Sequence, residues 1–261
     1  MLAPSRVLLS LAPLLVATTV MAQDPWARVP PLPTSCYGKE DNFAEALDRA
    51  RGELDAASTG QDKANRALTK QIFALDPATL QQRMMAAMQK NPAQAQQIMQ
   101  SMQQQGTAES QAQTAAIGQA QTRFEERKAK LIADYKAERD AMLGPIFVRI
   151  RKHTTESGGT AADDEAVRTG WIEYNNKYET VLCERWFKKE VTALLAEYRT
   201  YLVNDRIPKQ TESAAAAGRQ LELFGFSSRD YHTTAGLNGA ADYLRFAYDL
   251  FNPRRSEPSM P

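Results

Sequence analysis

Apolar side chains recur at helical spacing from Glu165 to Asn204, and this run constrains the fold more than any other feature of the sequence. At the rise of an α-helix it predicts a rod about 60 Å long. A heptad-like stripe needs a partner helix, either from this chain or from another copy. The stripe shifts by one residue between Trp186 and Phe187, and its members are Val167, Trp171, Tyr174, Tyr178, Leu182, Trp186, Phe187, Val191, Leu194, Tyr198 and Leu202. Its aromatic members fit either a packed core or the lining of a ligand groove.

The rest of the chain also carries helical periodicity and no alternating pattern typical of a strand. Turn-forming or helix-breaking residues favour an interruption at Ser58–Gly60, a kink or break at Gly144–Pro145 and the end of the long run at Pro208. The sequence therefore predicts an all-α fold. We expect an elongated, coiled-coil-like bundle of long antiparallel helices, with two short Met/Gln-rich helices and a Pro-rich N-terminal arm.

The segments follow one another in a simple order. We expect a signal peptide at 1–22, a Pro-rich extended arm at 23–40, a helical region at 41–152 that includes the short helices at 77–105, a linker at 153–164, and the long aromatic-striped helix with the C-terminal helices at 165–261. In the arm, Trp26 is a candidate anchor onto the helical body.

The first 22 residues have the composition of a cleavable secretory leader. A positive charge at Arg6 precedes a largely apolar run from Val7 to Val20, and small or apolar residues come before a cut after Ala22. No later stretch has the length and apolar character of a membrane span. The sequence predicts a periplasmic or secreted protein with no integral membrane span.

The cysteine content predicts a disulfide, and the charge balance excludes one class of partner. The two cysteines, Cys36 and Cys183, are expected to form a disulfide in an oxidising compartment, and an intermolecular bridge stays open as an alternative. Without Arg6 the chain has 31 basic and 31 acidic side chains. This balance argues against a nucleic-acid partner, which a basic excess would mark.

Catalytic and metal-binding patterns are weak. His153 and His232 have no cysteine, histidine or carboxylate at metal-ligand spacing, and no nucleophile or phosphate-binding motif is present. The acidic run 163–165 is explained by helix capping and the helix dipole. We therefore expect no enzyme activity, no cofactor and no metal site of the usual kinds.

The region from Asp76 to Gly106 is the least explained by structure alone, because it holds five methionines and ten glutamines but, after Asp76, only two charges, Arg83 and Lys90. Asp76 and Asn91 are N-caps, each followed by a proline at the first helical position. One apolar face runs along these two short helices, and its residues are Leu80, Met84, Met85, Met88, Ile98, Met99 and Met102.

Four interpretations of this face remain. It can pack onto the bundle as core, since methionine fills irregular gaps. It can bind apolar partner segments, because flexible methionines repack around different partners. The thioethers of Met84, Met88, Met99 and Met102 can bind Cu(I) or Ag(I). Finally, the glutamine tract can be disordered and self-associating.

The two helices resemble the Asp/Asn-Pro helical repeats of stress-inducible co-chaperones and ubiquilins. Asp76 and Pro77 open one repeat and Asn91 and Pro92 the other, and the seven residues of the apolar face follow them. The resemblance covers only this part of the 261 residues, and it implies short helices that cradle apolar segments. We expect a non-enzymatic, exported protein that binds or holds a protein partner in the bacterial cell envelope, as a chaperone or adaptor. The alternatives are a structural coiled-coil homo-oligomer and a soft-metal binder.

Overall fold

The computed structural model describes residues 24–32, 40–105, 108–155, 160–228, 231 and 233–251, and every regular element in this part of the chain is a helix. The all-α prediction is confirmed for these residues. In chain order the elements are η1 (Pro25–Arg28), α1 (Glu40–Phe73), α2 (Pro77–Lys90), α3 (Pro92–Gln105), α4 (Ala108–Thr155), α5 (Ala161–Lys177), η2 (Tyr178–Val191), α6 (Thr192–Tyr201), η3 (Leu202–Arg206), α7 (Ile207–Glu222) and α8 (Ala235–Phe251).

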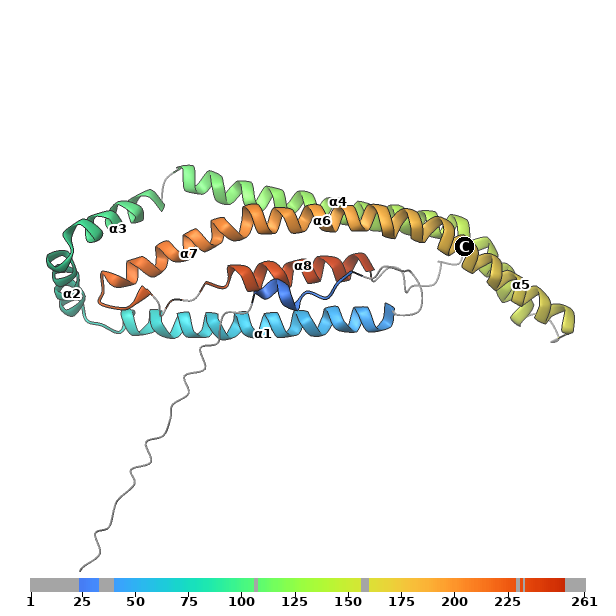
Figure 1. Ribbon diagram of the computed structural model, residues 1–261, viewed down its shortest axis with the longest axis horizontal. Coiled ribbons are helices and arrows are strands. Elements are labelled where there is room, and N and C mark those ends of the chain that lie inside the picture. Colours follow the sequence, from blue (N-terminus) through green and yellow to red (C-terminus); the bar gives the residue numbers. More distant parts are fainter. Residues whose placement is uncertain are drawn as a thin grey trace, which may run out of the picture.

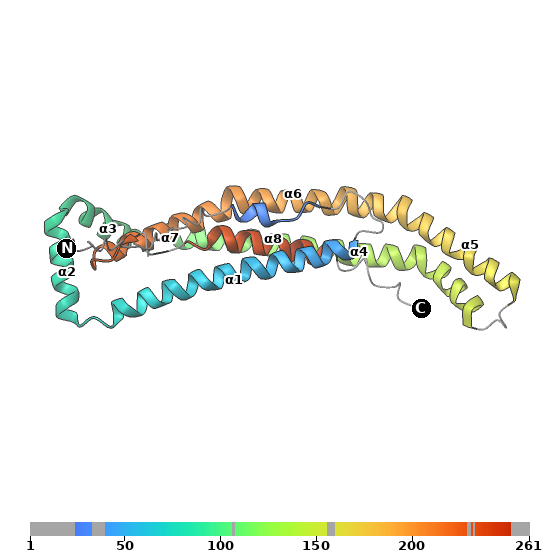
Figure 2. The same cartoon turned by 60° about the horizontal axis from the view of Figure 1, so that its bottom comes forward.

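The long helices lie lengthwise in an elongated body (Figure 1). Helix α4 runs along the molecule, and the chain returns beside it through α5, η2, α6, η3 and α7. Helix α8 lies between α1 and α6 in the rotated view of Figure 2. Helices α2 and α3 close one end of the body, whereas the paired helices α4 and α5 extend beyond it at the other end.

The main core surrounds α8, which contacts α1, α4, α6 and α7. Leu244 and Leu250 on this helix are completely buried. The alanines of α8 let neighbouring helices approach closely, and the aromatic side chains of the long run fill the space between them. Tyr198 stacks on Phe246 with ring centroids 4.2 Å apart, and Phe187 meets Phe251 edge-on at 4.8 Å. Trp26 from η1 contacts Tyr243 of α8, with 5.5 Å between ring centroids.

The long run is one continuous helical rod from α5 to α7, and its partner helices come from the same chain. Its π-helical segment η2 contains the point between Trp186 and Phe187 where the stripe shifts by one residue. A π-helix has more residues per turn than an α-helix, so the widened turns keep both parts of the stripe directed into the core. Trp186, Phe187 and Leu202 are all buried. From Leu182 onward the stripe is therefore core, although Trp171 near its start is exposed.

None of the three expected interruptions ends a helix. Helix α1 continues through residues 58–60, because the Ser58 hydroxyl is buried and donates to Asn238 Oδ1 of α8 at 2.5 Å. Helix α4 continues through Pro145, and the α4–α5 pair curves away from the body around this part of the molecule (Figure 1). The rod also continues past Pro208, which lies in the first turn of α7 directly after the π-helical segment η3.

Two further expectations about the chain need correction. The arm is not extended throughout, since Pro25–Arg28 forms a single 3₁₀ turn in which the Asp24 side chain accepts from the Trp26 backbone N–H at 3.0 Å. The rod begins at Ala161, within the expected linker and before Glu165, because Thr160 and Asp163 form a capping box. Asp163 Oδ2 accepts from the Thr160 hydroxyl at 2.5 Å, so this carboxylate serves the helix terminus as expected.

Candidate functional site

Helices α2 and α3 lie where the sequence predicts them, and their caps explain their starting points. Asp76 Oδ1 accepts from the Thr79 backbone N–H at 2.9 Å and Oδ2 accepts from the Thr79 hydroxyl at 2.6 Å. Both hydrogen bonds from Thr79 lower the pKa of Asp76, and the one from the Thr79 side chain has the larger effect. Asn91 Oδ1 accepts from the Gln94 backbone N–H at 3.2 Å. Each cap directs a short helix across the end of the body (Figures 1 and 2).

Few contacts hold this end onto α7. A small buried cluster consists of Ala95, Ile98 and Leu223, and Met88 and Met99 pack against it. Helix α7 ends at a turn in which Gly225 has φ +75°, a conformation that favours glycine. The Phe226 backbone N–H donates to the Leu221 carbonyl at 3.1 Å, so the chain folds back towards α2.

Polar contacts from α2 and α3 reach the same turn. Arg83 Nη1 donates to the Phe224 carbonyl at 3.1 Å, and its guanidinium lies 5.3 Å from the centre of the Phe226 ring. Gln94 Nε2 donates to Glu222 Oε2 at 2.5 Å. The end is therefore fastened by a small apolar cluster and by individual polar contacts, and helix α2 has no buried residue.

The predicted contact face divides into a packed part and an accessible part. Ile98 is buried, and Met88 and Met99 are half-buried against it. Leu80 and Met84 are also half-buried, whereas Met85 is 54% exposed. The side chain of Met102 lies outside the described part of the structure. The interpretation of the face as core therefore applies to Ile98 and in part to Met88 and Met99.

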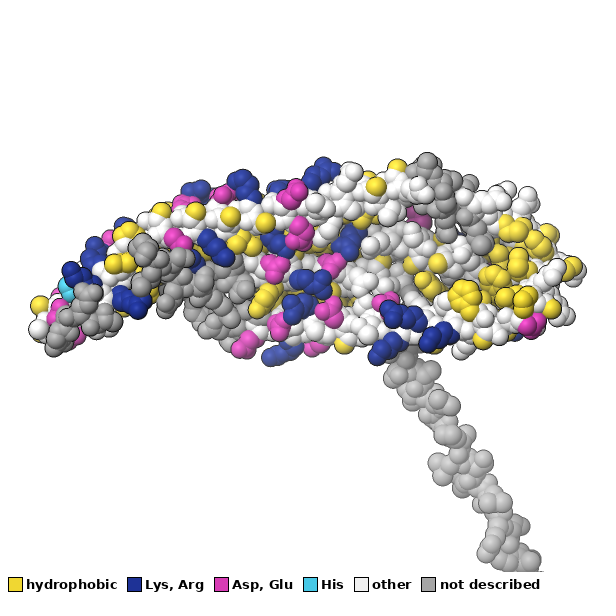
Figure 3. Space-filling model, turned by 180° about the vertical axis from the view of Figure 1, so that it is seen from behind, with side chains coloured by type: hydrophobic (Ala, Val, Ile, Leu, Met, Phe, Trp, Pro, Cys, Tyr) yellow, Lys and Arg dark blue, Asp and Glu magenta, His cyan; other side chains and the backbone are white. Residues whose placement is uncertain are grey.

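Hydrophobic side chains gather on the surface at this end of the molecule (Figure 3). Phe73, the last residue of α1, is 82% exposed, the highest value among the large hydrophobic residues of the described chain. Phe73 is not among the residues that the sequence predicts for this face. Its signal in the sequence is an aromatic residue at the end of a helical segment, just before the helix-starting pair Asp76 and Pro77. We call Phe73, Leu80, Met84, Met85 and Met88 the end surface.

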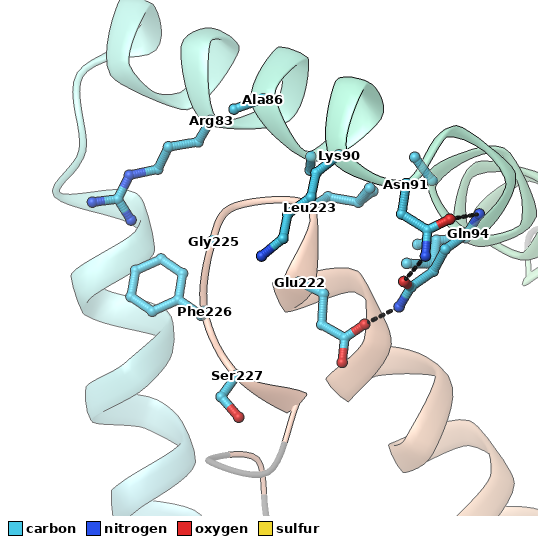
Figure 4. A pocket seen from close by; sticks show the side chains of 13 residues that line it. Arg83, Ala86, Lys90, Asn91, Gln94, Glu222, Leu223, Gly225, Phe226 and Ser227 are labelled. Carbon is cyan, nitrogen blue, oxygen red and sulfur yellow. Dashed lines mark hydrogen bonds between the residues drawn. The ribbon is translucent and has the colours of Figure 1, made fainter.

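A cavity of about 670 Å³ lies between α2, α3 and the turn after α7 (Figure 4). Its polar lining includes Arg83, Lys90, Gln94 and Glu222, and Figure 4 shows the Lys90 side chain reaching from α2 into the space above Glu222. Its apolar lining is Ala86, Ala87, Ala95, Ile98, Leu223 and Phe226. Sequence analysis missed this cavity, because its walls come from segments more than a hundred residues apart.

Within the described residues, no group of three or more histidine, cysteine or acidic side chains could hold a metal ion. His153 lies instead near the far end of the α4–α5 pair, where its Nδ1 is 3.1 Å from Asp163 Oδ1, and His232 lies outside the described residues. Cys183 is buried in the main core, while Cys36 lies outside the described residues, so the disulfide stays a prediction.

Comparisons with known proteins do not assign a family. No family model, curated protein or solved structure matches the chain. Among the described helices, none combines the length and the apolar character needed to cross a membrane. The interpretation of the site therefore depends on its own geometry.

Proposed function

We propose that the protein is a non-enzymatic holding protein that binds apolar segments of partner proteins at its end surface. The observation that carries this proposal is the exposure of Phe73 at the end of α1 and of Met85 on α2, a helix with no fully buried residue. In the body, most large apolar side chains are packed into one core, and those that are exposed on the rod, such as Trp171 and Val181, are less exposed than Phe73 and Met85. Exposed apolar groups concentrated in one place are typical of an interaction site.

The composition of the end surface suits partners of varied sequence. Methionine side chains are flexible and polarizable, so Met84, Met85 and Met88 can adapt to different apolar groups. The exposed neighbours Gln81 and Gln82 are polar without charge. They keep the helix soluble and impose no charge preference on a partner.

Suppression of aggregation tests the proposal. An unfolded outer-membrane protein is diluted from urea with the wild-type chain or with the triple variant Met84→Gln, Met85→Gln, Met88→Gln, and light scattering is followed. The wild type is expected to suppress scattering, and the triple variant to lose most of that effect. A matched control changes the exposed residues Val181 and Val203 of the rod to Gln and is expected to behave as wild type. Equal loss in both variants, or no suppression by the wild type, would contradict the proposal.

Export is part of the same proposal. We infer that the protein acts in the periplasm or outside the cell after cleavage behind Ala22, and that Cys36 and Cys183 form an intramolecular disulfide. Intact mass of the protein purified from a periplasmic extract would start at Gln23. A thiol count under denaturing, non-reducing conditions would give no free cysteine in the monomer, and two free cysteines would contradict the bridge.

A structural homo-oligomer is the second candidate, and a different region favours it. Trp171 and Ile172 on α5 are 41% and 48% exposed, in the part of the α4–α5 pair that extends beyond the body. These side chains could join two copies. Light scattering coupled to size exclusion distinguishes the candidates, because a monomer at all concentrations contradicts the oligomer.

A further inference from the structure

The cavity beneath α2 has an excess of positive charge in its lining. Arg83 and Lys90 contribute two cationic groups, against one acidic side chain, Glu222. Both oxygens of Glu222 already accept hydrogen bonds, from Gln94 Nε2 and from Ser228 Oγ, each at 2.5 Å. No carboxylate in the described part of the chain forms an ion pair with Lys90. Its ammonium group is therefore available to an anion that enters the cavity (Figure 4).

The walls of the cavity, unlike its charged groups, favour an apolar part of the ligand. The apolar lining comes from Ala86 and Ala87 of α2, from Ala95 and Ile98 of α3, and from Leu223 at the end of α7. Small alanine side chains leave room between the helices for a slender apolar group. The volume of about 670 Å³ lies within the usual range for small-molecule sites. A fitting ligand therefore has an anionic head and an apolar chain.

The other polar groups of the lining already have hydrogen-bond partners, and this favours an acyl chain over a peptide as the ligand. Arg83 donates to the Phe224 carbonyl, Asn91 caps α3, and Gln94 donates to Glu222. A peptide backbone would bring several N–H and C=O groups into the cavity, and each one left without a partner would cost binding free energy. An aliphatic chain has no such groups, so the lining favours it over a peptide terminus.

We propose that this cavity binds the carboxylate of an unbranched aliphatic acid, with Lys90 as the ion-pair partner and the alanine-lined walls around the chain. The site differs from the end surface, although Met88 of that surface packs against residues that line the cavity. Arg83, Ala87 and Lys90 are spaced four and three residues apart and form one face of α2, whereas Leu80, Met84 and Met88 form another. The proposal does not depend on the proposed holding function.

Calorimetric titration of the full chain with decanoate tests the site. Decanol serves as the uncharged probe of the same chain length, and decyltrimethylammonium as the cationic one. We expect decanoate to bind and the other two probes to bind at least about tenfold more weakly, as expected for loss of a charged hydrogen bond. The variant Lys90→Gln should lose about tenfold or more in decanoate affinity. The matched control Lys63→Gln changes an exposed lysine of α1 and should bind as wild type.

Several results would overturn the proposal. Decanol binding as tightly as decanoate would mean that the ammonium group of Lys90 has no role, and unchanged affinity in Lys90→Gln would mean the same. Absence of decanoate binding would exclude the aliphatic acid. If a short apolar peptide with a free C-terminal carboxylate bound with Lys90 dependence while decanoate did not, the site would be a peptide site. The variant Met85→Gln, whose side chain belongs to neither buried cluster, should bind decanoate normally, which separates this result from the holding function.

Discussion

The body around α8 and the end formed by α2 and α3 are both helical and rich in alanine, yet they differ in how much they bury. Leu244 in the body has no exposed surface and lies among aromatic neighbours from several helices. At the end, only Ala95, Ile98 and Leu223 form a buried cluster. The difference shows that helix formation and core formation are separate properties of a sequence. Caps and periodicity start the helices in both regions, while the supply of large side chains from neighbouring elements decides which region becomes core.

The largest predicted difference between the regions comes from truncating a leucine in each. Leu244→Ala should lower the free energy of unfolding by about 2 to 5 kcal/mol, because it leaves a cavity that close-packed neighbours cannot fill. Leu223→Ala should cost roughly 1 to 2 kcal/mol, since the small cluster at the end can collapse around the change. Urea unfolding followed by circular dichroism measures both. Equal losses would mean that the end is packed as firmly as the body.

The pH dependence of stability gives a second test, of how deeply Tyr198 is buried in the body. Burial raises the pKa of Tyr198 to about 12 from an ordinary value of 10.0, although the hydrogen bond from Gln121 acts in the opposite direction. The folded state therefore keeps this proton at a pH where the unfolded chain releases it. The contribution of Tyr198 to the free energy of unfolding is fully present below about pH 10. Between about pH 10 and 12 the protein loses about 2 to 3 kcal/mol of stability for this reason.

The variant Tyr198→Phe isolates this effect. Its melting temperature should fall less than that of the wild type across the same pH range, although it also loses the Gln121 hydrogen bond of 2.9 Å. An identical alkaline decline in both proteins would contradict the assignment to Tyr198.

Close packing of helices in the body gives a third test. A Cβ atom at Gly239 of α8 would lie 2.5 Å from Ile207 Cδ1 and 2.7 Å from Cγ1, so Gly239→Ala should cost about 1 to 3 kcal/mol. Gly118 of α4 is the matched control, since a Cβ there would meet nothing within 4 Å. Gly118→Ala should stabilise the protein by up to about 1 kcal/mol through helix propensity. Thermal unfolding of both variants measures the two changes in stability. Destabilisation by Gly118→Ala would contradict the explanation by close packing at Gly239.

The smallest effect is expected at the end surface. Met85→Gln changes a side chain that is 54% exposed and belongs to neither buried cluster, so it should alter the free energy of unfolding by less than about 0.5 kcal/mol. Urea unfolding checks this value. A loss above about 1 kcal/mol would indicate that Met85 contributes to packing rather than to a binding surface.

Local sequence signals predicted the helices well. The caps at Asp76 and Asn91 place α2 and α3, because capping depends on neighbours within a few positions. The one-residue shift of the stripe after Trp186 falls inside the π-helical segment, although no π-helix was predicted. The expected break at Ser58 failed for a tertiary reason, since Asn238 supplies a hydrogen-bond partner from a distant helix.

The candidate site was only partly predictable. The methionine face of α2 follows from periodicity, but the burial of Ile98 depends on contact with Leu223, which nothing in the local sequence reveals. The cavity depends in the same way on the turn at Gly225 meeting α2. The glycine after a helix predicts the turn, while its position against Arg83 and Lys90 results from the packing of α7 beside α3.

Site-specific crosslinking tests the central claim most directly. A photoreactive amino acid replaces Met85 in one protein and Val181 of the rod in another, two exposed apolar positions far apart in the fold. Each protein is illuminated in the presence of an unfolded outer-membrane protein diluted from urea. Strong crosslinking is expected from position 85 and little from position 181. Crosslinking from 181 alone, or equal crosslinking from both positions, would contradict a binding surface confined to the α2–α3 end.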